Sequence, residues 1–164
     1  MPRAIVAVGS ATVVLLASFA GLTEEPRPPM EIALSIVGGK RWTGQYHAKG
    51  TPRACGKIQT IGPSLWNFSF PDEGTFDVTD LVLTLPVTED GKPSDKFNLA
   101  VSLARAGQPI QPQFFVDGED PRSGKGTVVV KQDGKSVQVH LTGEKAEKTH
   151  EKFELTLTCT ELGK

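Results

Sequence analysis

Two cysteines are the most reactive side chains of this 164-residue chain, and they stand far apart, at Cys55 and Cys159. One of them could act as a nucleophile, but a catalytic thiol needs a histidine and an orienting partner close to it in space. The alternative is a single disulfide, which is the usual state of a cysteine pair in an oxidising compartment. Because the N-terminus predicts export, as described below, we expect a Cys55–Cys159 disulfide.

Metal binding is a second chemistry that the residue types allow. A zinc site needs three or four converging ligands, usually with short spacings between some of them, and the three histidines have no such spacing. Asp117, Glu119 and Asp120 crowd three carboxylates into four residues, which makes them weak calcium candidates. The alternating ligand pattern of calcium loops is missing there. We therefore expect an ordinary acidic turn and no metal site.

Aromatic side chains are the remaining candidates, because an exposed ring can bind a ligand by stacking. Neighbouring residues of a strand point to opposite faces, so only one of Phe114 and Phe115 can enter a single core. The other ring is exposed, meets a second layer or meets a ligand. Trp42 and Tyr46 fall on one face, where they could stack on a sugar ring or, as is commoner, pack in the core. These four residues are the ligand-binding candidates.

Several function classes lack support in the sequence. The formal net charge is −1, and no basic stretch stands out, so we expect no nucleic-acid partner. The chain has no serine nucleophile elbow, no Ser-x-x-Lys and no phosphate-binding loop, so we predict neither an enzyme nor a cofactor. A hydrolase with spatially assembled carboxylates stays an alternative, because the spacing of such acids is set by the fold rather than by the sequence.

Residues 1–20 predict a signal peptide. Arg3 supplies a positive charge, residues 4–16 are uncharged and mostly apolar, and Ser18-Phe19-Ala20 places small residues where a signal peptidase cuts. The uncharged stretch continues to Leu22, so an uncleaved membrane anchor is the alternative. The chain is therefore expected in the cell envelope, in the periplasm or outside the cell, with membrane contact only through the export signal.

Beyond the signal we expect an extended, proline-rich linker at residues 21–30 and one domain at residues 31–164. Within the domain, apolar and polar residues alternate almost everywhere, which is the pattern of half-buried antiparallel strands. The phase of this alternation slips between Val78 and Leu81, which predicts a β-bulge or a bend where a strand changes sheet. Eight or nine short strands without a helical period predict an all-β fold, an antiparallel sandwich or a barrel-like relative.

One hairpin is predicted in detail. Asp133-Gly134 is a typical two-residue turn of type I′, whose central residues both need a positive φ. This turn would pair Gln132 with Lys135 and Val130 with Val137. The valines on both sides then share one face.

The C-terminal third resembles known envelope proteins. Residues 126–135, a valine strand followed by Asp-Gly-Lys, lead to a last strand at 153–159 that ends in Cys159. This pattern is similar to small exported bacterial β-sandwich proteins, among them the family of the mycobacterial 19 kDa lipoprotein antigen. The chain has no lipid-anchoring cysteine at its signal, and no functional residue is carried over. The resemblance implies a bacterial, exported β-sandwich.

Two classes of function remain as expectations. The first is a binding or interaction module of the cell envelope, with a protein or glycan partner, that uses the loop at residues 104–126 and an exposed aromatic residue, because long loops on β-scaffolds commonly carry binding sites. The second is a structural or stress-resistant secreted domain without a small ligand. Stabilisation by a ligand distinguishes the two.

Overall fold

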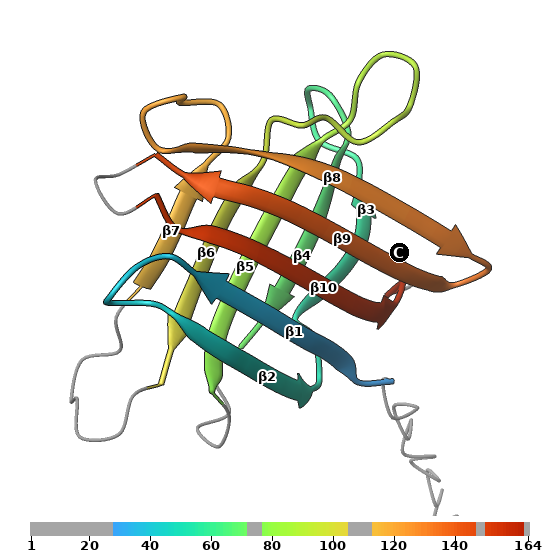
Figure 1. Ribbon diagram of the computed structural model, residues 1–164. Helices are drawn as coiled ribbons and strands as arrows, with labels where there is room; N and C mark the ends of the chain where they lie inside the picture. Colours follow the sequence, from blue (N-terminus) through green and yellow to red (C-terminus); the bar gives the residue numbers. More distant parts are fainter. Residues whose placement is uncertain (1–27, 72–76, 105–112, 147–149, 163–164) are drawn as a thin grey trace, which may run out of the picture.

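The protein is a sandwich of two antiparallel sheets (Figure 1). The computed structural model describes residues 28–71, 77–104, 113–146 and 150–162. Sheet A consists, in spatial order, of β2 (Gly44–Gly50), β1 (Met30–Val37), β10 (Lys152–Thr160), β9 (Ser136–Lys145) and β8 (Gly124–Asp133). Sheet B consists of β3 (Ala54–Ile58), β4 (Leu65–Phe70), β5 (Val78–Pro86), β6 (Asn98–Leu103) and β7 (Gln113–Asp117).

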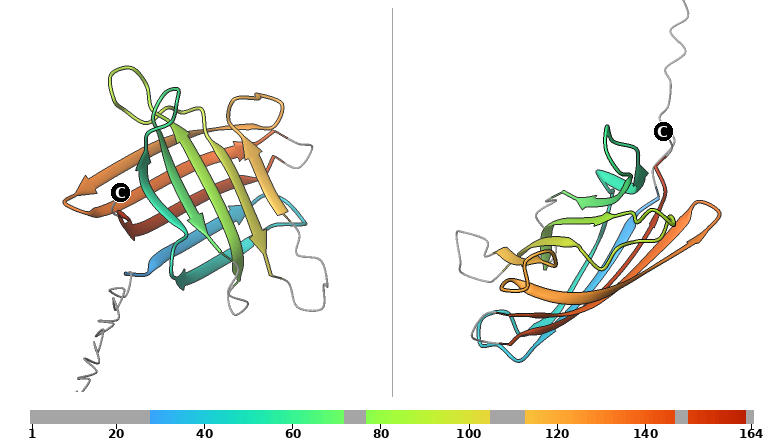
Figure 2. Two further views of the ribbon diagram at one scale, coloured as in Figure 1. Left: turned by 180° about the vertical axis from the view of Figure 1, so that it is seen from behind. Right: turned by 90° about the horizontal axis from the view of Figure 1, so that it is seen from above.

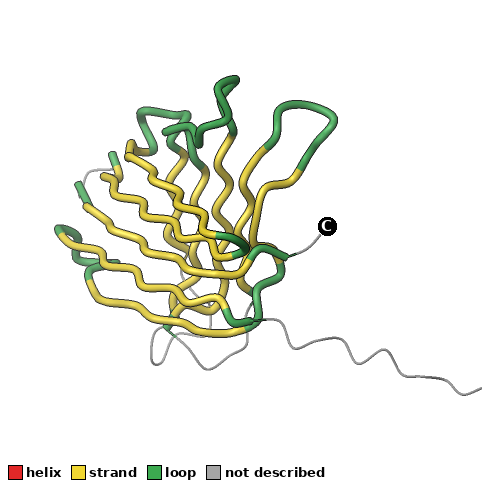
Figure 3. The backbone as a smooth tube through the Cα atoms, turned by 90° about the vertical axis from the view of Figure 1, so that its right-hand side faces the viewer, coloured by secondary structure: helices red, strands yellow, loops and turns green. Residues whose placement is uncertain are grey.

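The chain passes between the sheets twice, after β2 and after β7. Figure 2 shows the two layers from behind and from above, and Figure 3 shows strands joined by loops. The described residues contain no helix long and apolar enough to cross a membrane. The predicted signal peptide and most of the predicted linker lie outside the described residues, and β1 begins at Met30, the last linker position.

The predicted all-β fold is confirmed, and neither sheet closes into a barrel. The core follows from the alternation, because each strand turns every second side chain toward the other sheet. Leu34 of β1, Leu83 of β5 and Leu155 of β10 are buried in this way. The described residues form ten strands, and β3 is the one that the sequence pattern does not predict. Its five residues follow Pro52 and contain a glycine, so they are too short and irregular to show a period of two.

The β8–β9 hairpin exists, but the predicted register is wrong. Asp133 pairs with Ser136 and Val130 with Val139, so the loop is Gly134-Lys135 rather than Asp133-Gly134. Gly134 has a φ of 58° and Lys135 has no positive φ. A glycine at the first loop position fits a type II′ turn, which needs a positive φ only there. Every partner shifts by two residues, so the side chains keep the faces that were predicted.

The predicted irregularity in β5 is confirmed as a bulge. The β5–β6 register shifts between Val78 and Asp80, and β5 stays in sheet B throughout. The intervening Thr79 is buried, and its hydroxyl donates to the Ser102 carbonyl oxygen at 3.3 Å.

The predicted Cys55–Cys159 disulfide is also confirmed. It joins β3 of sheet B to β10 of sheet A, with the Cα atoms 6.3 Å apart. Both cysteines are buried, as the apolar parity of Cys159 predicts. The bond lies at the end of β10 that is remote from Phe153 and from the start of that strand.

Candidate ligand-binding site

A row of aromatic rings fills the end of the sandwich where β9 ends and β10 begins. Trp42, in the turn before β2, meets Phe114 edge to face with ring centroids 6.0 Å apart. Phe114 meets Phe153 at 5.6 Å, and Phe153 meets Phe97 at 6.2 Å, again edge to face. These contacts link the β1–β2 turn, β7, β10 and the segment before β6. Edge-to-face pairs prefer a defined geometry, so the contacts also fix the positions of the rings relative to one another.

Beside this row, at the edge of the sandwich next to β7, lies a hollow of about 460 Å³. We call it the β7 hollow. Its lining residues come from both sheets and from the β1–β2 and β7–β8 turns: Arg41, Trp42, Gln113, Phe115, Ser123, Lys145 and Glu151. The volume lies in the usual range for small-ligand sites, and the mixture of rings with a few charged groups is also typical of them.

Two charged residues of this lining are buried. Glu151 is 1% exposed and Lys145 is 7% exposed, and the Lys145 main-chain N–H donates to the Glu151 carbonyl oxygen at 2.8 Å. The Lys145 ammonium lies 5.5 Å from the centroid of the Phe114 ring, a distance at which a cation is attracted by the ring face. Both signs of charge are thus buried along one hollow, and a buried charge costs less when an opposite charge accompanies it than when it is buried alone.

A third charge stands at the rim of the β7 hollow. Arg41 is exposed, and its guanidinium carbon lies 4.7 Å from the centroid of the Trp42 ring. The formal charges of Arg41, Lys145 and Glu151 sum to one positive charge, which belongs to the exposed arginine.

The structure places the four aromatic candidates in different environments. Phe114 is fully buried, whereas Phe115 is 40% exposed, so the alternation predicted for this pair is confirmed. Trp42 and Phe115 both line the β7 hollow, and Phe114 lies beneath Trp42. Tyr46 is buried in the core, and its hydroxyl donates to the Trp42 carbonyl oxygen at 2.7 Å. Trp42 and Tyr46 therefore pack in the core rather than forming an exposed pair of rings.

The two buried charges are not among the predicted site residues, although the sequence carries a signal for them. In β9 the inward positions Val139 and Leu141 continue, two residues at a time, to Lys145. In β10 the inward position Phe153 continues backwards to Glu151. A charged residue interrupts the apolar pattern, so the alternation by itself predicts no inward side chain at these two positions.

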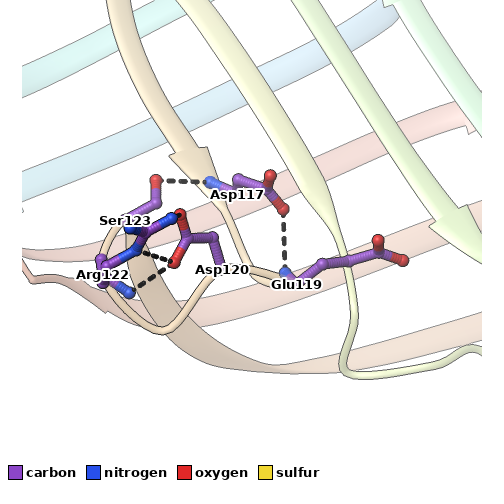
Figure 4. A network of polar contacts seen from close by, with 5 residues as sticks. All are labelled: Asp117, Glu119, Asp120, Arg122 and Ser123. Atoms are coloured by element: carbon purple, nitrogen blue, oxygen red, sulfur yellow. Dashed lines mark hydrogen bonds and ion pairs between the residues drawn. The ribbon is translucent and has the colours of Figure 1, made fainter.

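The acidic turn between β7 and β8 is shown in Figure 4. Asp117 accepts a hydrogen bond from the Glu119 main-chain N–H at 2.9 Å, and the Glu119 carboxylate points away from the other two. Asp120 accepts hydrogen bonds from the main-chain N–H, the Nε and the Nη2 of Arg122, at 2.9–3.0 Å. These bonds lower the pKa of Asp120, chiefly through the Arg122 side chain, and raise the pKa of Arg122. Two of the three calcium candidates thus accept bonds from the turn itself.

This turn also fixes one wall of the β7 hollow. The Ser123 hydroxyl accepts a hydrogen bond from the Asp117 N–H at 2.9 Å, and the Ser123 carbonyl accepts one from Ala146 at 2.9 Å. The turn is therefore tied to β7 on one side and to the end of β9 on the other.

The histidines lie elsewhere. His47 on β2 and His140 on β9 point outward from sheet A, and His150 lies in the turn before β10 with its Nδ1 3.3 Å from a Glu144 oxygen. No three His, Cys, Asp or Glu side chains of the described ranges come together as a metal site would need.

Comparisons of the chain with protein-family models, with curated proteins and with solved structures found no match.

Proposed function

We propose that this chain is an exported binding module of the cell envelope and that the β7 hollow is its ligand site. The observation that carries the proposal is the combination in one place of an exposed ring, Phe115, with an exposed cation, Arg41, over two buried charges. If this position served only the stability of the fold, well-packed apolar residues would stabilise it as well as buried charges do, or better. Polar groups that converge on an apolar hollow are instead the usual composition of a binding site.

Export is the second part of the proposal. It is supported by the N-terminal sequence, and the Cys55–Cys159 disulfide is compatible with an oxidising compartment. The proposal assigns no catalytic step to the hollow.

Thermal unfolding of the oxidised protein against glycans, lipid headgroups, short peptides and divalent metals tests the function. A ligand at 100 times its dissociation constant stabilises the fold by about 2.7 kcal/mol, which raises the melting temperature by several degrees for a domain of this size. We expect at least one class to do so. The stabilisation should be lost in Phe115→Ser and weakened in Arg41→Gln.

Val129→Ser is the matched control, because Val129 is also an exposed apolar residue of a strand, 44% exposed, but lies on β8 outside the β7 hollow. This variant should keep the ligand effect. A ligand effect lost equally in the Val129 and Phe115 variants would contradict the assignment to the hollow. If no class stabilises the protein, the proposed binding function is wrong and a structural role takes its place.

A further inference from the structure

The backbone direction of β7 leaves part of its edge open. The Gly118 N–H continues the ladder to β6 by donating to the Phe97 carbonyl at 2.7 Å, whereas the Asp117 N–H turns the other way, to the Ser123 hydroxyl. Main-chain groups of an antiparallel strand alternate in direction from one residue to the next. The N–H and C=O groups of Phe115 and Gln113 therefore point away from β6, as the Asp117 N–H does.

Nothing within the described ranges pairs with these outward groups of Phe115. Two other edge strands are treated differently. On β3 the Cys55 carbonyl accepts a hydrogen bond from Leu162 at 3.0 Å, and on β8 the Val128 N–H donates to the Asp95 carboxylate at 3.3 Å. Proteins usually cover or interrupt edge strands because open ones pair with other chains. The β7 edge is left open beside the β7 hollow.

A strand added along this edge would lie over the hollow, since Gln113 and Phe115 line both. The added residue opposite Phe115 would place its side chain on the same face as the Phe115 ring. Its two neighbours would point the opposite way, toward sheet A. Trp42 lies on that side, because it contacts the inward-facing ring of Phe114, and Arg41 lies over Trp42.

The net positive charge of the hollow favours a peptide with an acidic side chain. The formal charges of Lys145 and Glu151 cancel in sum, so the net positive charge of the lining is that of Arg41, which is exposed. An acidic side chain next to the residue opposite Phe115 would meet this guanidinium, and an arginine–carboxylate pair is a strong, directional one.

We propose that β7 binds an extended peptide segment of another protein as a sixth strand of sheet B. An apolar side chain of that segment packs on Phe115, and an adjacent acidic side chain reaches Arg41. Main-chain hydrogen bonds supply affinity in such strand addition and the side-chain pockets supply specificity. This inference rests on the proposed function, because it names the ligand class of the same hollow.

The test is an NMR titration of the isotope-labelled, disulfide-bonded protein with the peptide acetyl-Thr-Thr-Glu-Val-Glu-Thr-Thr-amide. Its valine has an acid on each side, so the peptide meets the requirement in either strand direction. We expect amide shifts along β7 and around the β7 hollow. Two control peptides, one with lysines in place of both acids and one N-methylated at the valine, should bind at least about tenfold more weakly.

Two substitutions separate main-chain pairing from side-chain contact. Phe115→Ala keeps the outward N–H, whereas Phe115→Pro removes it without removing a bond to β6, and proline is tolerated at such edge positions. We expect Phe115→Pro to bind at least about tenfold more weakly than Phe115→Ala. If the proline variant fails to fold, the N-methylated peptide decides the same question on the unaltered protein.

The outcomes distinguish the inference from the function on which it rests. Equal binding of the proline and alanine variants, together with equal binding of the N-methylated peptide, overturns strand addition but leaves the hollow as a ligand site. Absence of binding at about 1 mM peptide, while another ligand class stabilises the protein through Phe115, overturns the peptide and keeps the function. If neither the peptide nor any other class binds, both fail.

Discussion

Two corners of the sandwich are closed in different ways. At the corner of β3, the Cys55–Cys159 disulfide joins the sheets, and the residues after β10 lie against β3. The Leu162 N–H donates to the Cys55 carbonyl oxygen, and the Glu161 N–H donates to the Lys135 carbonyl oxygen. At the corner of β7, the described parts of the sheets are joined by the β7–β8 turn of the chain itself and by no disulfide. Packed rings hold them together, and the β7 hollow stays open between them.

The two corners therefore differ in what they leave accessible to a ligand. A disulfide constrains the unfolded chain and needs no further space in the folded one, so the β3 corner can be closed and its edge covered. The β7 corner keeps an edge strand and the exposed ring of Phe115 accessible. Three charged residues, Arg41, Lys145 and Glu151, line the hollow there. Binding surfaces are commonly placed on parts of a fold whose packing is incomplete, because a fully packed corner leaves a ligand nothing to contact.

The largest expected effect concerns the ring that supports the β7 corner. Phe114→Ala removes a fully buried ring that contacts Trp42 and Phe153, so unfolding should become easier by about 3–5 kcal/mol. Phe115→Ala should cost about 1 kcal/mol or less, because this ring is partly in water. Urea unfolding measures both, and two equally unstable variants would show that both rings belong to the core.

Removal of the disulfide is the next largest change. The bond closes a loop of 104 residues, so the chain-entropy model gives about 4.7 kcal/mol as an upper figure, which strain and residual structure lower. The double variant Cys55→Ser, Cys159→Ser should lose about 2–4 kcal/mol in urea unfolding. Ligand binding at the β7 corner should survive wherever this variant is folded. Loss of binding in the folded variant would show that the two corners are coupled rather than independent.

Side-chain parity explains how much of both corners could be predicted. Alternation alone separated Phe114 from Phe115 and placed Cys159 on the inner face, because a strand leaves no other choice for neighbouring residues. The sequence could not show which inward residues of different strands meet. The contact of Trp42 with Phe114 depends on the crossing of two sheets, which no local pattern encodes.

The hairpin shows a different limit. The Asp133-Gly134 pair is compatible with more than one turn. The choice between a loop at 133–134 and one at 134–135 depends on the sign of φ at a single residue. Both registers bury the same faces, so the hydrophobic pattern could not decide between them. Lys145 and Glu151 were missed for a different reason: they continue the inward alternation of β9 and β10, but a charged residue interrupts the apolar pattern by which inward positions are recognised.

A smaller effect tests the placement of Glu151 in the β7 corner. A Cβ added at Gly39 would collide with the Glu151 carboxylate, so Gly39→Ala must move that side chain. We expect a loss of about 1–3 kcal/mol in stability and altered ligand affinity at the hollow. Gly62→Ala is the matched control, because its nearest neighbour is the Thr60 hydroxyl at 3.8 Å. Equal stability and affinity of the two variants would contradict the assigned role of Glu151 in the hollow.

The smallest effect concerns the turn that carries Ser123 beside the hollow. The pKa of Asp120 is held below its ordinary value by hydrogen bonds from Arg122, first those of its side chain. A carboxyl whose folded pKa is lowered stabilises the fold above its unfolded pKa and loses that contribution as the pH falls through its folded pKa. Because the pair is exposed to water and screened, the melting temperature of Arg122→Gln should match that of the unaltered protein at neutral pH.

The titration of Asp120 itself is the sensitive measurement. In Arg122→Gln its pKa should rise toward the ordinary value without reaching it, because the main-chain N–H of residue 122 still donates to Oδ1. Carboxyl NMR signals followed through acid pH measure this, with Lys131→Gln, an exposed charge farther along β8, as the control. If Asp120 titrates at its ordinary value in the unaltered protein, the turn beside the β7 hollow is positioned by Ser123 and Ala146 alone. The β7 corner would then depend even more fully on packing than the contrast with the disulfide corner already indicates.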